Sequence, residues 1–247
     1  IFKDKHSLQK EIHNKHIVEI GPGRGALTDE ILKFNPRSLV VIEKDFELSR
    51  LLKEKYINNK SIKIFNNDIL KFDLEKILQK NSVIFGNLPY NISSQILVKI
   101  IKFKKWPPKF LDLIFMFQKE LGEKIIGSYQ SQNYGRLSIL TSLRLNISKK
   151  FIISPNCFRP RPKVNSMIIH FKPKKMLYKI NSISKLEKIT NIFFSNKRKM
   201  INKAFKKLNI VDKKFFNKHN INLSLRAENL SEKLYYKIAE YYENKIK

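Results

Sequence analysis

The sequence predicts an α/β protein with a doubly wound sheet, followed by a small, basic helical domain. From residue 16 onward, short runs rich in β-branched and aromatic residues alternate with helical patterns, which is typical of parallel βαβ units. These runs are apolar throughout, as expected for strands that are covered on both faces. After "FKPKK" (171–175) every periodic segment has a helical pattern.

The expected elements follow one another at short intervals. Four strands come first, at 16–21, 38–45, 62–68 and 82–88, and helices at 26–33, 46–55 and 74–79 separate them. Another helix begins near Ser93, a fifth strand covers 112–118, and a helix covers 119–128. "FIISP" (151–155) and "SMIIHF" (166–171) are later strands. We therefore expect a sheet domain over residues 1–175 and a helical domain over 176–247.

In the helical domain, Ser184 and Glu187 have the spacing of a capping box, and Ser231 suits the N-cap of the last helix. Residues 184–208 form one long periodic segment. Its apolar positions are expected to face the protein, which would leave much of its charge free; they are Ile192, Phe193, Met200, Ile201 and Phe205.

The composition limits the class of protein. The chain has 247 residues, 42% of them hydrophobic, which suffices for one α/β core and a smaller unit. No run approaches eighteen apolar residues, so no membrane span is expected. Cys157 is the one cysteine, and the five histidines lack metal-ligand spacing. We expect no disulfide, no bound metal and a reducing, cytoplasmic setting.

The charge is strongly basic, with 50 Lys and Arg against 21 Asp and Glu, a net +29. Such a chain is attracted to polyanions, of which nucleic acid is the commonest. An AT-rich genome would also enrich a protein surface in Lys. Charge alone therefore leaves a nucleic-acid partner and a compositional bias both open.

A glycine-rich turn, "EIGPGRGALT" (19–28), follows the first strand. Gly21 and Gly23 allow a tight turn and close approach of a ligand, and Gly25 lets the helix pack near the strand. Glu43 ends the second strand, where a carboxylate can accept hydrogen bonds from two ribose hydroxyls. The pattern suits either NAD or S-adenosylmethionine.

The ends of the third and fourth strands separate these alternatives. Asp68 could receive the amino group of a cofactor adenine, and strand four ends in Asn87-Leu88-Pro89-Tyr90. The exocyclic nitrogen of a target adenine is a poor nucleophile, because its lone pair is delocalised. The Asn87 side-chain oxygen and the Leu88 carbonyl would hold that amine in line with a methyl donor. Pro89 stiffens the turn, and Tyr90 offers a ring on which an extruded base can stack.

Seven motifs, in order along nearly the whole chain, resemble the ribosomal RNA adenine N6,N6-dimethyltransferase family, specifically the KsgA type that acts on small-subunit rRNA. They are "VEIGPGRGALT", "VIEKD", "NND", "GNLPYNISSQIL", "FMFQKELGEKI", "NCFRPRPKVNSMII" and "LRAENLS". The resemblance implies a Rossmann-like S-adenosylmethionine-dependent methyltransferase sheet with a small C-terminal helical domain. It also implies S-adenosyl-L-methionine as cofactor.

The resemblance assigns residues by motif. Cofactor binding falls to the following residues: Glu19, Gly21, Gly23, Glu43, Lys44, Asp68, Ile69 and Asn87. The catalytic set is Asn87, Leu88, Pro89 and Tyr90, with Phe158 closing over the other face of the target base. A core position for Phe158 is the alternative. Contacts to RNA phosphates are expected from these basic residues: Arg159, Arg161, Lys163, Lys197, Arg198, Lys206 and Lys207. The family usually opens with a Gly-Gln-x-Phe segment, and this sequence starts just after it, so a preceding segment is expected.

The expected function is dimethylation of two adjacent adenosines in a hairpin loop near the 3′ end of small-subunit rRNA, with a role in ribosome biogenesis. Immature small subunits are the expected partner, and the chain is expected to be a monomer. One alternative is the macrolide-resistance type, which methylates large-subunit rRNA and shares every sheet motif, although "LRAENLS" favours the small-subunit type. The other is a non-catalytic ribosome-assembly or RNA-binding factor, which an intact Asn87–Tyr90 segment argues against.

Overall fold

The computed structural model describes residues 12–158 and 161–245, and the chain divides into two compact units. The first unit comprises the chain up to Gly122 together with Asn146–Lys174. The second comprises Glu123–Leu145 and the chain from Lys175 onward. The chain thus enters the second unit for good at the boundary expected near 175. Residues 123–145, expected in the sheet domain, belong instead to the helical unit.

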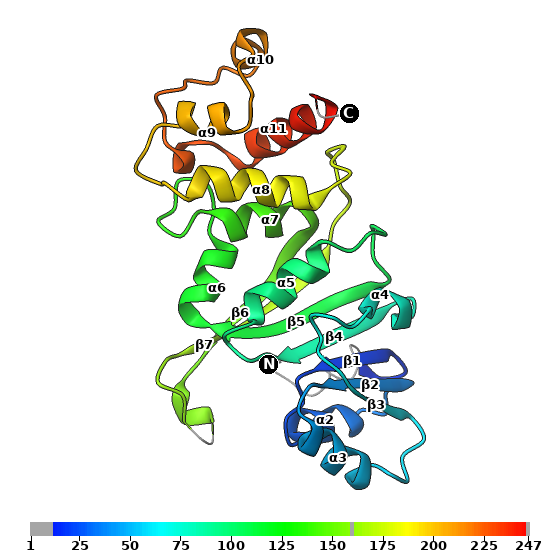
Figure 1. The fold of residues 1–247 in the computed structure, drawn as a ribbon. Helices are drawn as coiled ribbons and strands as arrows, with labels where there is room; N and C mark the ends of the chain where they lie inside the picture. The colour runs from blue at the N-terminus through cyan, green and yellow to red at the C-terminus, as the bar shows by residue number, and fades with distance from the viewer. Residues whose placement is uncertain (1–11, 159–160, 246–247) are drawn as a thin grey trace. The chain divides into compact units, whose positions relative to one another are not determined.

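The first unit is built on a seven-stranded sheet in the order β3-β2-β1-β4-β5-β7-β6 (Figure 1). The pairs from β3 to β5 are parallel, whereas β7 runs antiparallel to β5. The predicted parallel pattern therefore holds for five strands and not for β7. The strands are β1 (His16–Ile20), β2 (Ser38–Glu43), β3 (Ile62–Asn66), β4 (Ser82–Asn87), β5 (Phe110–Gln118), β6 (Leu145–Ile153) and β7 (Ser166–Pro173).

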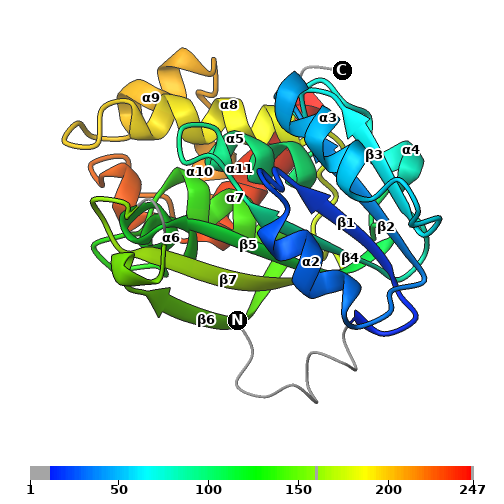
Figure 2. The same cartoon turned by 90° about the horizontal axis from the view of Figure 1, so that it is seen from below.

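Helices cover both faces of this sheet, and Figure 2 shows α2 on one face and α5 on the other. On the first face, Ile31 of α2 and Leu52 of α3 pack with strand residues such as Val41, Phe85 and Met116 into one buried cluster. Burial on both faces explains the continuous apolar strands. The helices that begin between these strands are α2 (Ala26–Leu32), α3 (Phe46–Lys55), α4 (Leu74–Ile77), α5 (Ser93–Ile101) and α6 (Lys119–Ile126).

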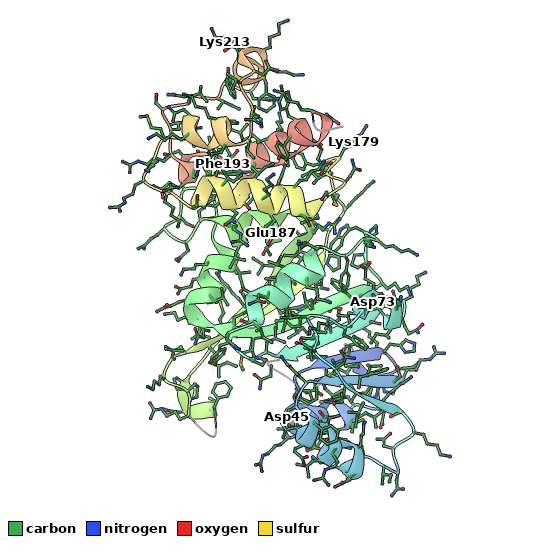
Figure 3. The ribbon with its side chains drawn as sticks, in the orientation of Figure 1. Asp45, Asp73, Lys179, Glu187, Phe193 and Lys213 are labelled. Atoms are coloured by element: carbon green, nitrogen blue, oxygen red, sulfur yellow. The ribbon has the colours of Figure 1, made fainter. Side chains whose placement is uncertain are left out.

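The second unit is helical, and its core contains Phe193, which is labelled in Figure 3. The Phe193 ring meets those of Phe205 and Tyr235 edge-on. Its α7 was not predicted. The Tyr236 hydroxyl donates to the Ile139 carbonyl of α7 at 2.8 Å, which ties α7 to α11 and explains why residues 123–145 belong here. The helices are α7 (Arg136–Arg144), α8 (Ile183–Phe194), α9 (Asn202–Lys207), α10 (Lys213–Lys218) and α11 (Glu232–Lys245).

The predicted continuous segment 184–208 is wrong, because a turn over residues 195–199 separates α8 from α9. Met200 lies in the connection, 51% exposed and bridged to Arg226, so it does not face the core. Of the other apolar positions, Phe193, Ile201 and Phe205 are buried, and Ile192 is half-buried.

The capping box predicted at Ser184 does not form. The N-cap of α8 is Ser182, and the Glu243 carboxylate accepts the backbone N–H groups of Asn181 and Ser182 at 2.9 and 2.8 Å. Glu187 instead forms an ion pair with Arg136 at 3.1 Å. The Ser231 cap is confirmed, since its Oγ accepts the Leu234 N–H at 3.4 Å. Within the described ranges, no helix has the length and apolar character needed to cross a membrane.

Candidate functional site

The sheet order reverses between β1 and β4, the position at which open α/β sheets bind ligands beyond the carboxyl ends of their strands. Ile20 of β1 pairs with Gly86 of β4, and the next residues are Gly21 and Asn87. A Cβ placed on Gly21 would lie 3.5 Å from the Asn87 carbonyl oxygen and 3.7 Å from Pro89 Cδ. The glycine turn and the end of β4 are therefore immediate neighbours.

The conformation of the glycine turn is fixed by its backbone dihedral angles and by a hydrogen bond to Glu43. Gly21 and Gly23 have φ of 68° and 59°, in the left-handed region that favours glycine. Glu43 is 8% exposed, and its Oε2 accepts the Gly23 N–H at 3.1 Å while its Oε1 accepts the Asp45 N–H at 3.0 Å. Asp45 in turn caps α3 (Figure 3). Glu43 thus joins the glycine turn to the start of α3 and keeps further lone pairs on both oxygens.

Glu19, on β1 below the turn, is a buried carboxylate with few partners. It is 1% exposed, and its Oε2 accepts the Thr28 hydroxyl at 2.6 Å. Its Oε1 is buried and has no hydrogen-bond partner among the described residues. Burial raises the pKa of Glu19 to about 7, the Thr28 hydrogen bond opposes this, and the carboxylates of Asp29 and Glu43 reinforce it. The site therefore holds a group that titrates near neutral pH.

Asp68 follows β3, whose last residue, Asn66, pairs with Glu43 at the end of β2. Its Oδ1 accepts the Leu70 N–H at 2.9 Å and its Oδ2 pairs with Lys44 Nζ at 3.0 Å, and these two contacts lower the pKa of Asp68. Ile69 is buried. Sequence reasoning missed Asn66, whose side-chain NH₂ donates to the carbonyls of Glu43 and Lys44 at 3.1 Å each. The sequence did offer a signal for Asn66, because it is an amide at the end of a predicted strand, next to Asn67-Asp68.

The end of β4 presents an amide, and the segment that follows it anchors a ring. Asn87 is exposed, whereas the side chain of the next residue, Leu88, is buried. A Cβ at Gly86 would lie 2.6 Å from Leu88 Cδ2 and 2.8 Å from Phe115 Cδ1, so a larger residue there would force these buried side chains to move. Tyr90 is half-buried, and its hydroxyl lies 2.7 Å from Ser166 Oγ. Ser166 was not predicted as a site residue, because sequence separation hides the contact.

The "CFRPRPKV" segment lies on the same unit. Phe158 is half-buried and packs against the sheet cluster that contains Met116 and Ile168, so part of its side chain belongs to the hydrophobic core. Arg161 and Lys163 are exposed, and Arg159 lies outside the described residues.

The remaining predicted RNA-binding residues belong to the helical unit. Lys197 and Arg198 are exposed in the turn after α8, and Lys206 and Lys207 are exposed in the last turn of α9. Lys197 Nζ lies 5.7 Å from the centroid of the Phe194 ring. In the part of the chain that the structure describes, no His, Cys, Asp or Glu cluster could hold a metal ion.

Comparison with known proteins agrees with this geometry. The model of the family described as ribosomal RNA adenine dimethylase matches residues 3–244. The chain is 45% identical to ribosomal RNA small subunit methyltransferase A of Pelagibacter ubique, over 98% of this chain and 93% of that protein. It is 37% identical to the Malacoplasma penetrans protein of the same name, over 92% and 82% of the two chains.

Two solved structures are similar over nearly the whole chain. A dimethyladenosine transferase from Plasmodium falciparum matches with a TM-score of 0.74 and 25% identity, over 99% of this chain and 98% of that one. The 23S rRNA methyltransferase ErmE shares the fold, with a TM-score of 0.63 and 19% identity over 98% and 99%. The glycine turn, the Asn87–Tyr90 segment and these matches lead to one conclusion: the chain belongs to the ribosomal RNA adenine dimethylase family.

Proposed function

We propose that this chain uses S-adenosylmethionine to dimethylate N6 of two adjacent adenosines in a hairpin loop near the 3′ end of small-subunit rRNA. The observation that carries this proposal is the contact between the glycine turn and the Asn87–Tyr90 segment at the β1/β4 switch point. The test is transfer of a tritiated methyl group to small subunits that lack the modification, followed by mass spectrometry of the rRNA. Absence of dimethyladenosine in the product would exclude the reaction.

The residues around the turn fit the cofactor. S-adenosylmethionine supplies an electrophilic methyl group on a sulfonium sulfur. Glu43 is fixed by two backbone N–H groups and can still accept two ribose hydroxyls. Asp68 is held ionised to accept an adenine amino group, with Lys44 and Ile69 beside it. Glu19 Oε1 has no hydrogen-bond partner within the described part of the chain, and this carboxylate, two residues before Gly21, suits a cationic amino group.

Catalysis in this proposal rests on positioning and polarisation. The Asn87 side-chain oxygen and the Leu88 carbonyl accept hydrogen bonds from the two N–H groups of the target amine. These bonds direct the lone pair of the amine nitrogen toward the methyl group. Single-stranded loops expose bases that can be extruded into such a pocket. Tyr90 stacks on one face of the base and Phe158 covers the other, while Pro89 stiffens the turn.

Replacing Glu43 by Ala should weaken cofactor binding, because the ribose loses its acceptors and Gly23 loses its hydrogen bond. Charge-assisted hydrogen bonds of this kind make the expected loss about 2 kcal/mol, roughly thirtyfold in Kd. Calorimetry with S-adenosylmethionine measures it. Glu47→Ala, which removes an exposed carboxylate from the same region, is the matched control and should leave Kd unchanged. An unaltered Kd in Glu43→Ala would place the ribose elsewhere.

The partner in this proposal is the immature small subunit, met in the cytoplasm by a monomeric enzyme that contributes to subunit biogenesis. Support comes from the net charge of +29 and from exposed basic residues in both units. Arg161 and Lys163 lie a few residues from Phe158, where rRNA phosphates flanking the target base would pass. Lys197, Arg198, Lys206 and Lys207 offer a second contact in the helical unit.

Reversal of Lys197, Arg198, Lys206 and Lys207 to Glu should lower affinity for the small subunit and flatten its salt dependence. Each lost phosphate contact reduces the log–log slope by about 0.7 to 0.9, because fewer counterions are released. Subunit binding at three salt concentrations measures this slope.

The control for these reversals carries the same change in net charge at four exposed lysines of the sheet unit, Lys53, Lys60, Lys80 and Lys109. Cofactor Kd should stay the same in both variants. Equal slopes for the two variants would remove these four helical-unit residues from the RNA contacts.

A further inference from the structure

Tyr90 and Ser166 are 76 residues apart in sequence, yet their hydroxyl oxygens lie 2.7 Å apart. Tyr90 belongs to the segment after β4, which leaves the sheet, whereas Ser166 is the first residue of β7 and is fully buried. The loop residue with the predicted stacking ring is thus bonded to the sheet by the far end of its side chain. We propose that Ser166 is a positioning residue that holds the Tyr90 ring in place as the stacking surface for the target base.

Ser166 is a rigid anchor because its backbone is fixed in the sheet. It pairs with Gln118 at the end of β5, and the neighbouring Asn165 carbonyl accepts the Lys119 N–H at 2.9 Å. In the same register, Asn87 pairs with Met116 of β5, and Met116 pairs with Ile168 of β7. The position of Asn87 and the position of Ser166, which anchors Tyr90, are therefore both fixed by the same set of hydrogen-bonded strands.

The hydrogen bond acts on the direction of the ring. The phenolic oxygen lies on the axis from Cβ through the ring, so fixing that oxygen fixes the direction of this axis. Because phenols form hydrogen bonds close to the ring plane, the bond to Ser166 also restricts rotation of the ring about this axis. The Tyr90 backbone is held separately, since its carbonyl accepts the Ser93 hydroxyl at 3.0 Å. With both ends of the residue held, the ring needs little ordering when a base arrives, which favours binding by preorganisation.

The two rings assigned to the target base rest on the same two strands. Ser166, which bonds Tyr90, begins β7. Phe158 packs on the sheet cluster that contains Met116 of β5 and Ile168 of β7. The spacing between the two stacking surfaces is then determined by β5 and β7, not by two independent loops.

This inference rests on the proposed function, and a double-mutant cycle tests it. Ser166→Ala should reduce kcat/KM for undermethylated small subunits by about five- to tenfold, the effect of losing one partly buried hydrogen bond, with cofactor Kd unchanged. In a Tyr90→Phe background the same substitution should have no further effect, because the partner hydroxyl is already gone. Ser166→Thr, which keeps a hydroxyl, should restore most of the activity. An equal loss in both backgrounds would mean that Ser166 only stabilises β7, and would overturn the proposal.

The matched control is Ser82→Ala. Ser82 is also fully buried, also begins a strand, and its hydroxyl donates to the Gln79 carbonyl at 2.6 Å, at the opposite end of β4. It should not change kcat/KM.

Amide hydrogen exchange of residues 87–92 gives a readout that needs no methyl transfer. Exchange should accelerate in Ser166→Ala and not in Ser82→Ala. Unchanged exchange in Ser166→Ala overturns the anchor. If exchange accelerates in Ser166→Ala as expected but the wild-type protein transfers no methyl group, the result counts against the proposed function alone.

Discussion

Replacing Asn87 by Ala should abolish methyl transfer while leaving S-adenosylmethionine binding within a few-fold of wild type. Loss of one preorganised polar contact to the reacting group typically reduces kcat by about a hundredfold or more. The structure adds a second expectation. Because Asn87 is exposed at the end of β4, its removal should change the free energy of unfolding by no more than about 0.5 kcal/mol. Tritium transfer, calorimetry and urea unfolding measure the three quantities.

The matched control is Asn91→Ala, an exposed amide in the same loop that is assigned no role. It should retain activity. Turnover near the wild-type rate in Asn87→Ala would exclude this amide as the group that orients the target amine. A large loss of stability would instead show that Asn87 is needed for the fold of the segment.

Glu19→Gln should stabilise the free protein above neutral pH and leave it unchanged in acid. Burial raises the pKa of Glu19 from 4.5 to about 7 in the folded protein. Below pH 4.5 the carboxyl is protonated in both states, so it imposes no penalty. Between pH 4.5 and 7 the unfolded chain loses this proton while the folded chain keeps it, and folding stability falls. A shift of this size corresponds to about 3 kcal/mol above pH 7.

Urea unfolding of wild type and Glu19→Gln at pH 5 and pH 8 measures this difference. The stability gain of the variant should be small at pH 5 and approach about 3 kcal/mol at pH 8. Glu30→Gln, which removes an exposed carboxylate from α2, should show no such pH-dependent gain. A gain that is the same at both pH values would show that Glu19 ionises normally in the folded protein.

The sequence by itself determined the part of the fold that depends on local pattern. The five strands from His16 to Gln118 and the helices between them were predicted, because each segment buries its own apolar residues against a sheet covered on both faces. The candidate site residues fall at the carboxyl ends of these strands for the same reason. Gly21 follows β1 and Asn87 ends β4, and adjacent parallel strands bring their carboxyl ends together.

Only the tertiary structure decided features that depend on partners distant in sequence. The direction of β7, the packing of α7 in the helical unit and the N-terminus of α8 each depend on such partners; for α8 the partner is Glu243, some sixty residues away. The pKa of Glu19 and the anchoring of Tyr90 by Ser166 have the same origin. Periodicity predicts which residues are buried. It carries no information on which buried polar atoms will meet, because these contacts form only when segments distant in sequence pack together.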